Sequence, residues 1–185
     1  MVDSGEKELA SRVLTGDLDA FGALIQEHQS SVFNVCYRIL GNRQEAEDLT
    51  QEAFIRAYKK LSRYDPSRPF GPWMRTLAAN LCYNHLRKSR LQRVSLEDEK
   101  DQLKDDPVRD PEFLLEISQE HRGLYQALWQ LPDNQRIALE LRHFQGLSYN
   151  EMAKILKLPL NTVRSHLYRG RQKLAEILEE GTHDR

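Results

Sequence analysis

The sequence has little of what would point to disulfide-rich, disordered or membrane proteins. It contains two cysteines, nine glycines and seven prolines in 185 residues, so neither a disulfide scaffold nor a low-complexity chain is indicated. Hydrophobic residues make up 39% and charged residues 30%, the balance of a folded globular protein. No apolar run approaches the roughly 20 residues that cross a bilayer, and the polar N-terminus lacks the features of a signal peptide. We therefore expect a cytoplasmic protein without membrane insertion.

Signatures of catalysis and metal binding are missing too. The sequence contains no phosphate-binding loop, no HExxH and no Ser-His-Asp spacing, and its six histidines are scattered. Cys36 and Cys82 do not form a CxxC pair and lie in apolar helical patterns, so we interpret them as buried reduced thiols. We expect no enzyme, and therefore no catalytic, cofactor-binding or metal-binding residues.

Acidic residues are absent from two long stretches, although the net charge of the whole chain is −1. Residues 71–96 carry five basic residues and no acidic one, and residues 161–173 carry four basic residues and no acidic one. Between them, residues 97–110 hold seven acidic residues against three basic ones. The basic charge is thus concentrated in two regions, which favours nucleic-acid binding.

Hydrophobic residues recur every three or four positions along most of the chain, which predicts helices. We expect Asp17, Asn42, Asp110, Ser148 and Asn161 to be N-caps. The expected helices cover residues 6–15, 17–40, 42–61, 72–90, 110–130, 133–144, 148–156 and 161–179. The fold class is therefore all-α, without strands. We expect two small helical bundles, at 1–92 and 111–185, joined by a flexible acidic linker at 93–110.

Residues 147–174, LSYNEMAKILKLPLNTVRSHLYRGRQKL, have the pattern of a helix-turn-helix motif. Ala153 is small where two helices must approach closely, and a tight turn precedes a longer basic helix that would enter the major groove. Lys157 stands where the turn often has glycine, so the turn either carries about 1–2 kcal/mol of strain or has a different geometry. The alternative is a surface hairpin with a solvated basic face. The candidate DNA contacts are Asn161, Thr162, Arg164, Ser165, Tyr168, Arg169 and Arg171.

A second stripe, of aromatic, amide and basic side chains, recurs every three or four positions in residues 72–90. Such groups suit unstacked single-stranded bases, which present π-faces and free Watson–Crick edges. For Trp73 and Tyr83 the alternative is burial in the core. The stripe consists of Trp73, Thr76, Asn80, Tyr83, Asn84 and Arg87.

The helix expected at 42–61 is acidic in its first half, whereas residues 71–96 are basic. Residues 43–52 hold four acidic residues against one basic residue. Such a run is usually a solvated face, but here it continues into the string QEAFIRAY.

Three stretches together resemble the extracytoplasmic-function sigma factors of bacterial RNA polymerase, group 4 of the sigma-70 family, of the sigma-E and sigma-W type. They are AEDLTQEAFIRAYKKL at 46–61, FGPWMRTLAANLCYNHLRK at 70–88 and LPDNQRIALELRHFQGLSYNEMAKILKLPLNTVRSHLYRGRQKL at 131–174. The resemblance implies a region 2-like first domain and a region 4-like second domain. The implied function is promoter-specific transcription initiation, in which the protein binds core RNA polymerase and reads the −35 duplex and a melted −10 element.

The resemblance also implies residue roles. The helix near Asp48 would dock on the β′ clamp helices of polymerase, and the β flap is a further expected partner. Asn80 would line the pocket for a flipped base, while Arg164, Ser165 and Arg169 match the −35 readers. The implied polymerase-binding set is Asp48, Gln51, Glu52, Phe54, Ile55 and Arg56. The implied −10 set is Phe70, Trp73, Thr76, Asn80, Tyr83, Asn84, Arg87, Lys88 and Arg90.

An anti-sigma factor that covers the polymerase-binding faces is an expected partner, together with polymerase and promoter DNA. The principal alternative is a helix-turn-helix regulator that acts without polymerase. An enzyme and a pure interaction protein, such as a polymerase-binding decoy, are further alternatives. The acidic helix and the stripe around Asn80 argue against the regulator, and the acid-free basic surface argues against the decoy.

Overall fold

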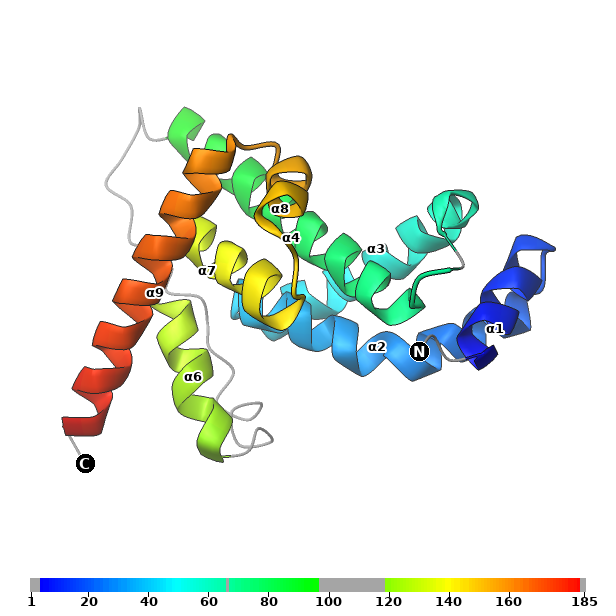
Figure 1. Ribbon diagram of the computed structural model, residues 1–185, viewed down its shortest axis with the longest axis horizontal. Coiled ribbons are helices and arrows are strands. Elements are labelled where there is room, and N and C mark those ends of the chain that lie inside the picture. The colour runs from blue at the N-terminus through cyan, green and yellow to red at the C-terminus, as the bar shows by residue number, and fades with distance from the viewer. Residues whose placement is uncertain (1–3, 66, 97–118, 184–185) are drawn as a thin grey trace.

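The computed structural model describes residues 4–65, 67–96 and 119–183, and every regular element in these ranges is helical (Figure 1). This confirms the all-α prediction for the described part of the chain. Residues 97–110 of the expected linker and the helix start expected at Asp110 lie outside these ranges. The elements are Ser4–Leu14 (α1), Leu18–Leu40 (α2), Arg43–Lys60 (α3), Leu61–Arg63 (η1), Phe70–Leu96 (α4), Gln119–Trp129 (α6), Asp133–Leu139 (α7), Glu140–Phe144 (η2), Tyr149–Leu156 (α8) and Leu160–His183 (α9).

Three of the five expected N-caps are formed, and Asp110 lies outside the described residues. The carboxylate of Asp17 and the side-chain carbonyl of Asn42 each accept a hydrogen bond from the backbone N–H three residues later, at 3.0 Å in both cases. Ser148 and Glu151 form a reciprocal capping box, in which the N–H of Ser148 donates to Glu151 Oε2 at 2.8 Å. These caps satisfy backbone donors that a helix leaves unpaired at its start.

Several expected helix limits were wrong. Helix α9 begins at Leu160, because the carbonyl of Pro159 accepts the first helical hydrogen bonds, so Asn161 lies inside the first turn and is not the cap. Helix α4 continues to Leu96 instead of ending near Arg90. The helix can continue this far because no glycine or proline interrupts residues 73–96.

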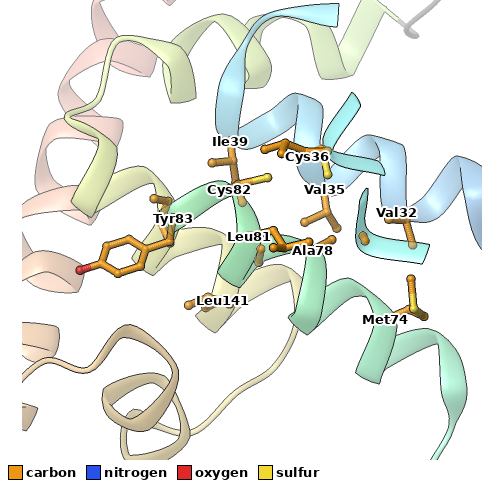
Figure 2. Close-up of a cluster of buried hydrophobic side chains, with 14 of the residues drawn as sticks. Val32, Val35, Cys36, Ile39, Met74, Ala78, Leu81, Cys82, Tyr83 and Leu141 are labelled. Atoms are coloured by element: carbon orange, nitrogen blue, oxygen red, sulfur yellow. The ribbon is translucent and has the colours of Figure 1, made fainter. Parts of the chain in front are cut away.

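Helices α2, α3 and α4 form the core of the first region, with α2 and α4 packed along each other. Figure 2 shows how the buried side chains Val32, Val35 and Ile39 of α2 lie against Met74 and Leu81 of α4.

Cys36 and Cys82 belong to the same cluster. Both are free and buried, as expected from the sequence, and burial raises the pKa of the Cys82 thiol.

The second region is built on the packing of α7 against α9, with α8 crossing α9. Leu141, Met152 and Leu167 are fully buried in its core. Gly170 of α9 lies against α7, where an added Cβ would stand 3.2 Å from Gln135 Cβ. The absence of a side chain at this position therefore helps the two helices to approach closely.

The two regions pack against each other through α2 and α4 on one side and α6, α7 and η2 on the other. Trp129 at the end of α6 lies over Gly41, the C-cap of α2, and its indole N–H donates to the carbonyl of Tyr37 at 3.2 Å. Gly41 has a φ of 72°, which favours glycine. In Figure 1, α1 and the pair α6 and α9 lie at opposite ends of the molecule.

The contact at Gly41 predicts the effect of a single methyl group. Gly41→Ala places a residue with a side chain in the left-handed region and its Cβ 3.2 Å from the Trp129 ring, so we expect the free energy of unfolding to fall by about 1–2 kcal/mol or more. Gly22→Ala is the control, because an added Cβ meets nothing within 4 Å there and should stabilise α2 by about 0.5–1 kcal/mol. Urea denaturation measures both changes, and equal effects of the same sign would contradict the prediction.

Candidate nucleic-acid and protein interfaces

The turn between α8 and α9 is held in a left-handed conformation by Lys157, which has φ 54° and ψ 43°. Among the described residues it is the only one other than glycine with a positive φ. The N–H groups of Lys157 and Leu158 both donate to the carbonyl of Ala153, which closes the end of α8. The strained-turn interpretation of the sequence is therefore confirmed, and α8 and α9 form the expected helix-turn-helix.

Helix α9 separates its apolar and polar side chains cleanly. Val163 and Leu167 are buried against the second region, while Tyr168 is 64% exposed. All seven candidate contact residues from the sequence lie at least partly in solvent. Asn161, Arg164, Tyr168, Arg169 and Arg171 are exposed, and Thr162 and Ser165 are half-buried. We call this exposed side of α9 the α9 face.

His143 of η2 joins the α9 face and was missed by sequence reasoning, since it precedes α9 in the chain. Arg171 Nε donates to its Nε2 at 3.1 Å, which requires that nitrogen to be unprotonated. Burial lowers the pKa of His143, and the charges of Arg171 and Arg142 lower it further. Burial also lowers the pKa of His166, and the charge of Arg169 lowers it further. Near neutral pH, the positive charge here therefore comes from arginines and not from histidines.

The start of α4 is anchored by aromatic packing. Phe70 is fully buried, and Trp73 is half-buried with its ring centroid 5.1 Å from that of Tyr64. The N–H of Phe70 donates to Glu6 Oε2 at 3.1 Å, so α1 supplies the acceptor for the first turn of α4. Phe70 therefore helps to position the helix, and Trp73 offers only part of its ring to solvent.

The middle of α4 carries the amide residues. Asn80 is half-buried, as is Thr76, while Asn84 is exposed. Asn84 Nδ2 donates to the backbone carbonyl of Asn80 at 2.8 Å and lies 3.2 Å from its Oδ1. Tyr83 is only 7% exposed, which agrees with the core alternative, although its ring points away from the cluster in Figure 2.

The end of α4 is basic and open. Arg87, Lys88 and Arg90 are exposed. Arg87 and Arg90, together with Tyr83, line a cleft of about 540 Å³ whose opposite wall is the start of α7 at Pro132–Asn134. The predicted −10 residues are thus divided along α4 into a buried start, a half-buried middle and a basic end.

Helix α3 carries an exposed stripe in which Asp48, Gln51 and Ile55 follow one another at helical spacing. Ile55 is 54% exposed. Arg56 is exposed and donates to Glu52 at 2.8 Å.

Phe54 is 5% exposed, because its position turns it inward with the buried Ala53 and Ala57. Sequence reasoning missed Tyr58, which is 43% exposed beside this stripe and packs on Phe21 with ring centroids 5.2 Å apart.

Glu6, Glu27 and His28 have ligand atoms within 4.8 Å of one another, close enough that they could hold a metal ion. Glu6 Oε1 lies 2.9 Å from His28 Nε2, and its other oxygen accepts from Phe70. The carboxylate thus joins α1, α2 and the start of α4, which gives the group a structural explanation.

Comparison with known proteins shows the family of the chain. Residues 24–92 match the family described as Sigma-70 region 2, and residues 121–174 match Sigma-70, region 4. The chain is 33% identical over 181 residues to the RNA polymerase sigma-H factor of Pseudomonas aeruginosa, with 94% of each chain covered. It is 34% identical to the ECF RNA polymerase sigma factor SigW of Bacillus subtilis, with 94% of this chain and 97% of that one covered. The chain belongs to the extracytoplasmic-function sigma factors.

Solved structures share the fold of this sigma factor. CnrH in complex with the cytosolic domain of CnrY matches with a TM-score of 0.62 at 22% identity, covering 96% of this chain and 99% of that chain. The sigma factor RpoE in complex with the anti-sigma factor NepR from Bartonella quintana matches with a TM-score of 0.60 at 24% identity, covering 86% and 96%.

The family is one of transcription initiation factors and not of enzymes. The alternative of a polymerase-independent regulator receives no support from these relatives. Within the described residues, no helix is both long and apolar enough to span a membrane.

The turn before the α9 face gives a second prediction. Lys157→Gly should raise the free energy of unfolding by about 1 kcal/mol, because glycine adopts the left-handed conformation without a Cβ penalty. The matched change Lys154→Gly, three residues earlier within α8, should lower it by about 1 kcal/mol. Thermal and urea denaturation report both values. If Lys157→Gly is as destabilising as Lys154→Gly, the strain assigned to the turn is wrong.

Proposed function

We propose that this sigma factor binds core RNA polymerase through the exposed stripe of α3 and promoter DNA through α4 and the α9 face. The observation that carries the proposal is the separation of three surfaces of different chemistry on two family regions. An acidic surface with one apolar side chain suits a basic protein partner. An acid-free helix and an arginine-rich recognition helix suit nucleic acid.

Polymerase docking is assigned to Asp48, Gln51, Glu52, Ile55 and Arg56, with the β′ clamp helices as the partner surface. Phe54 acts from inside the helix packing, because it is buried in the free chain. Ile55 would be the apolar anchor, since a large apolar side chain that is more than half exposed gains most from being covered. The β flap would be met by the second region.

Promoter reading is divided between the two regions. In α4, Trp73, Thr76, Asn80 and Asn84 face a melted −10 strand, and Arg87, Lys88 and Arg90 hold its phosphates. Phe70 and Tyr83 support the helix from within. On the α9 face, Arg164, Ser165 and Arg169 read the −35 duplex. Asn161, Thr162, Tyr168 and Arg171 lie beside them and contact the backbone.

We also propose a regulatory partner, a division into domains and a cellular location for the chain. RpoE is seen with an anti-sigma factor and CnrH with the cytosolic domain of CnrY, and we infer that an anti-sigma factor also regulates this chain. The proposed units are a region 2-like domain at 1–92, a linker at 93–110 and a region 4-like domain at 111–185. The site of action would be the cytoplasm, where transcription takes place in bacteria.

Run-off transcription with purified core polymerase on a promoter library tests the function directly. The full chain should bind core and start transcription at defined promoters. Ile55→Asp should weaken core binding by at least about tenfold, because a charge would be buried at the centre of the contact. The control is Leu178→Asp, which also replaces an exposed aliphatic side chain by a carboxylate, late in α9. A wild-type chain that binds no core, or that gives no promoter-specific product, would refute the proposal.

Two variants separate the DNA-binding roles. Asn80→Ala should reduce open-complex formation more than binding to duplex −35 DNA, since Asn80 is assigned to a base in single-stranded form. Arg169→Ala should weaken −35 recognition by about 1–3 kcal/mol while core binding is unchanged. Arg63→Ala, an exposed arginine of η1, serves as the charge-matched control. Permanganate footprinting measures promoter opening, and a duplex-binding assay measures −35 recognition. If both variants show equal losses in both assays, the division of DNA-binding roles between Asn80 and Arg169 is wrong.

A further inference from the structure

The cluster of Glu6, Glu27 and His28 has one feature that the structural role of the Glu6 carboxylate does not explain. His28 Nε2 lies 2.9 Å from Glu6 Oε1 and 4.0 Å from Glu27 Oε1. The His28 side chain is only 10% exposed, yet within the described part of the chain its Nε2 has no hydrogen-bond partner. A buried polar atom without such a partner is costly and requires a physical reason.

The distances around His28 Nε2 are those of ligands that share one ion. Glu6 Oε1 and His28 Nε2 are close but do not meet in hydrogen-bond geometry. Two ligands of one metal ion have this relation, because each lone pair points at the ion and not at the other ligand. Ligand atoms that stand about 2.0–2.2 Å from an ion lie about 3 Å apart at right angles and about 4 Å apart on opposite sides. The distances of 2.9 and 4.0 Å fit these two arrangements.

The two buried ligands are held in position by the start of α4. An added Cβ on Gly71 would stand 3.0 Å from His28 Cε1, so the imidazole ring is packed tightly against this helix. The ring of Phe70 lies beside it, with the ring centroids 5.5 Å apart. Glu6 Oε2 accepts the N–H of Phe70, which orients the carboxylate while Oε1 stays beside His28. Such support from outside the ligand set is what orients the ligands of a metal ion.

Glu27 forms the open side of the cluster. Its side chain is 48% exposed, so an ion can enter from solvent and keep water as a further ligand. Two carboxylates and a neutral imidazole balance the charge of a divalent cation. The mixture of nitrogen and oxygen donors suits zinc and related first-row transition metals, whereas Mg²⁺ and Ca²⁺ prefer oxygen ligands alone.

We propose that Glu6, Glu27 and His28 bind a divalent first-row transition-metal ion, represented by Zn²⁺, where α1, α2 and the start of α4 meet. The ligands come from α1 and α2, so the ion ties α1 to the rest of the first region. None of the three ligands belongs to the surfaces assigned to polymerase or DNA, and the inference therefore stands apart from the proposed function. No local motif predicts this site, because Glu6 meets the other two ligands only through helix packing.

Isothermal titration calorimetry of the full chain, without an affinity tag, measures the binding of Zn²⁺. The wild type should bind Zn²⁺ at one saturable site, and Zn²⁺ should raise its midpoint of thermal unfolding, whereas Mg²⁺ at the same concentration should not. His28→Gln and Glu27→Gln should each weaken the affinity by at least about tenfold. Co²⁺ should bind without a thiolate charge-transfer band, which separates this site from Cys36 and Cys82.

A second pair of histidine and glutamate supplies the matched controls. His85 Nε2 lies 3.8 Å from Glu45 Oε1, and both side chains are exposed. His85→Gln and Glu45→Gln remove the same chemical groups as the main variants, but from a pair outside the proposed cluster. Both control variants should therefore keep the wild-type affinity for Zn²⁺.

Two variants guard against loss of folding, which circular dichroism checks. Glu27→Gln changes a side chain that is about half exposed, and Glu6→Gln keeps an oxygen acceptor for the N–H of Phe70 while it removes the charge. Both should stay folded and bind Zn²⁺ more weakly. The site is refuted if the wild type shows no saturable Zn²⁺ binding, if folded Glu27→Gln and His28→Gln keep the wild-type affinity, or if the control variants lose as much affinity.

Discussion

Arg38 and Glu140 can be buried only together, and this requirement determines how the two regions meet. An isolated buried charge costs several kcal/mol even after relaxation, so α2 must bring its guanidinium to the place where η2 supplies a carboxylate. The segment η2 is a π-helix, whose turn is wider than that of an α-helix, and it places Glu140, Phe144 and Gln145 around the contact with Arg38. Short π-helical segments are frequent at functional positions. Trp129 over Gly41 then forms the second point of contact.

Helix α4 has to serve both packing and recognition, which explains why its predicted DNA-reading residues differ so much in exposure. One side of the helix fills the core against α2, with Met74, Ala78 and Cys82 fully buried. Its first turn is held by Glu6, and its last turns carry the exposed arginines. Aromatic residues near the packed side, such as Phe70 and Tyr83, are drawn into the core because burying a ring is more favourable than exposing it.

Charges of opposite sign lie on separate surfaces of the molecule. A net charge of −1 conceals an acidic stripe on α3 and acid-free faces on α4 and α9. Placing opposite charges on separate helices lets one small chain attract a basic protein surface and a polyanion without self-neutralisation. The neutral state favoured for His143 and His166 leaves the α9 face dependent on arginine, which keeps its charge at any physiological pH.

The sequence by itself determined the helical class, most N-caps, the strained Lys157 turn and the helix-turn-helix, because these depend on interactions within one or two turns of the chain. Periodicity also indicated the inward side of α3, but the family resemblance placed Phe54 among the polymerase-binding residues, and its burial became visible only in the structure. The pairing of Arg38 with Glu140 spans 102 residues, and no local pattern specifies such a partner. Only the tertiary structure decided that contact and the cleft at the end of α4, because both arise from the packing of surfaces that lie far apart in the chain.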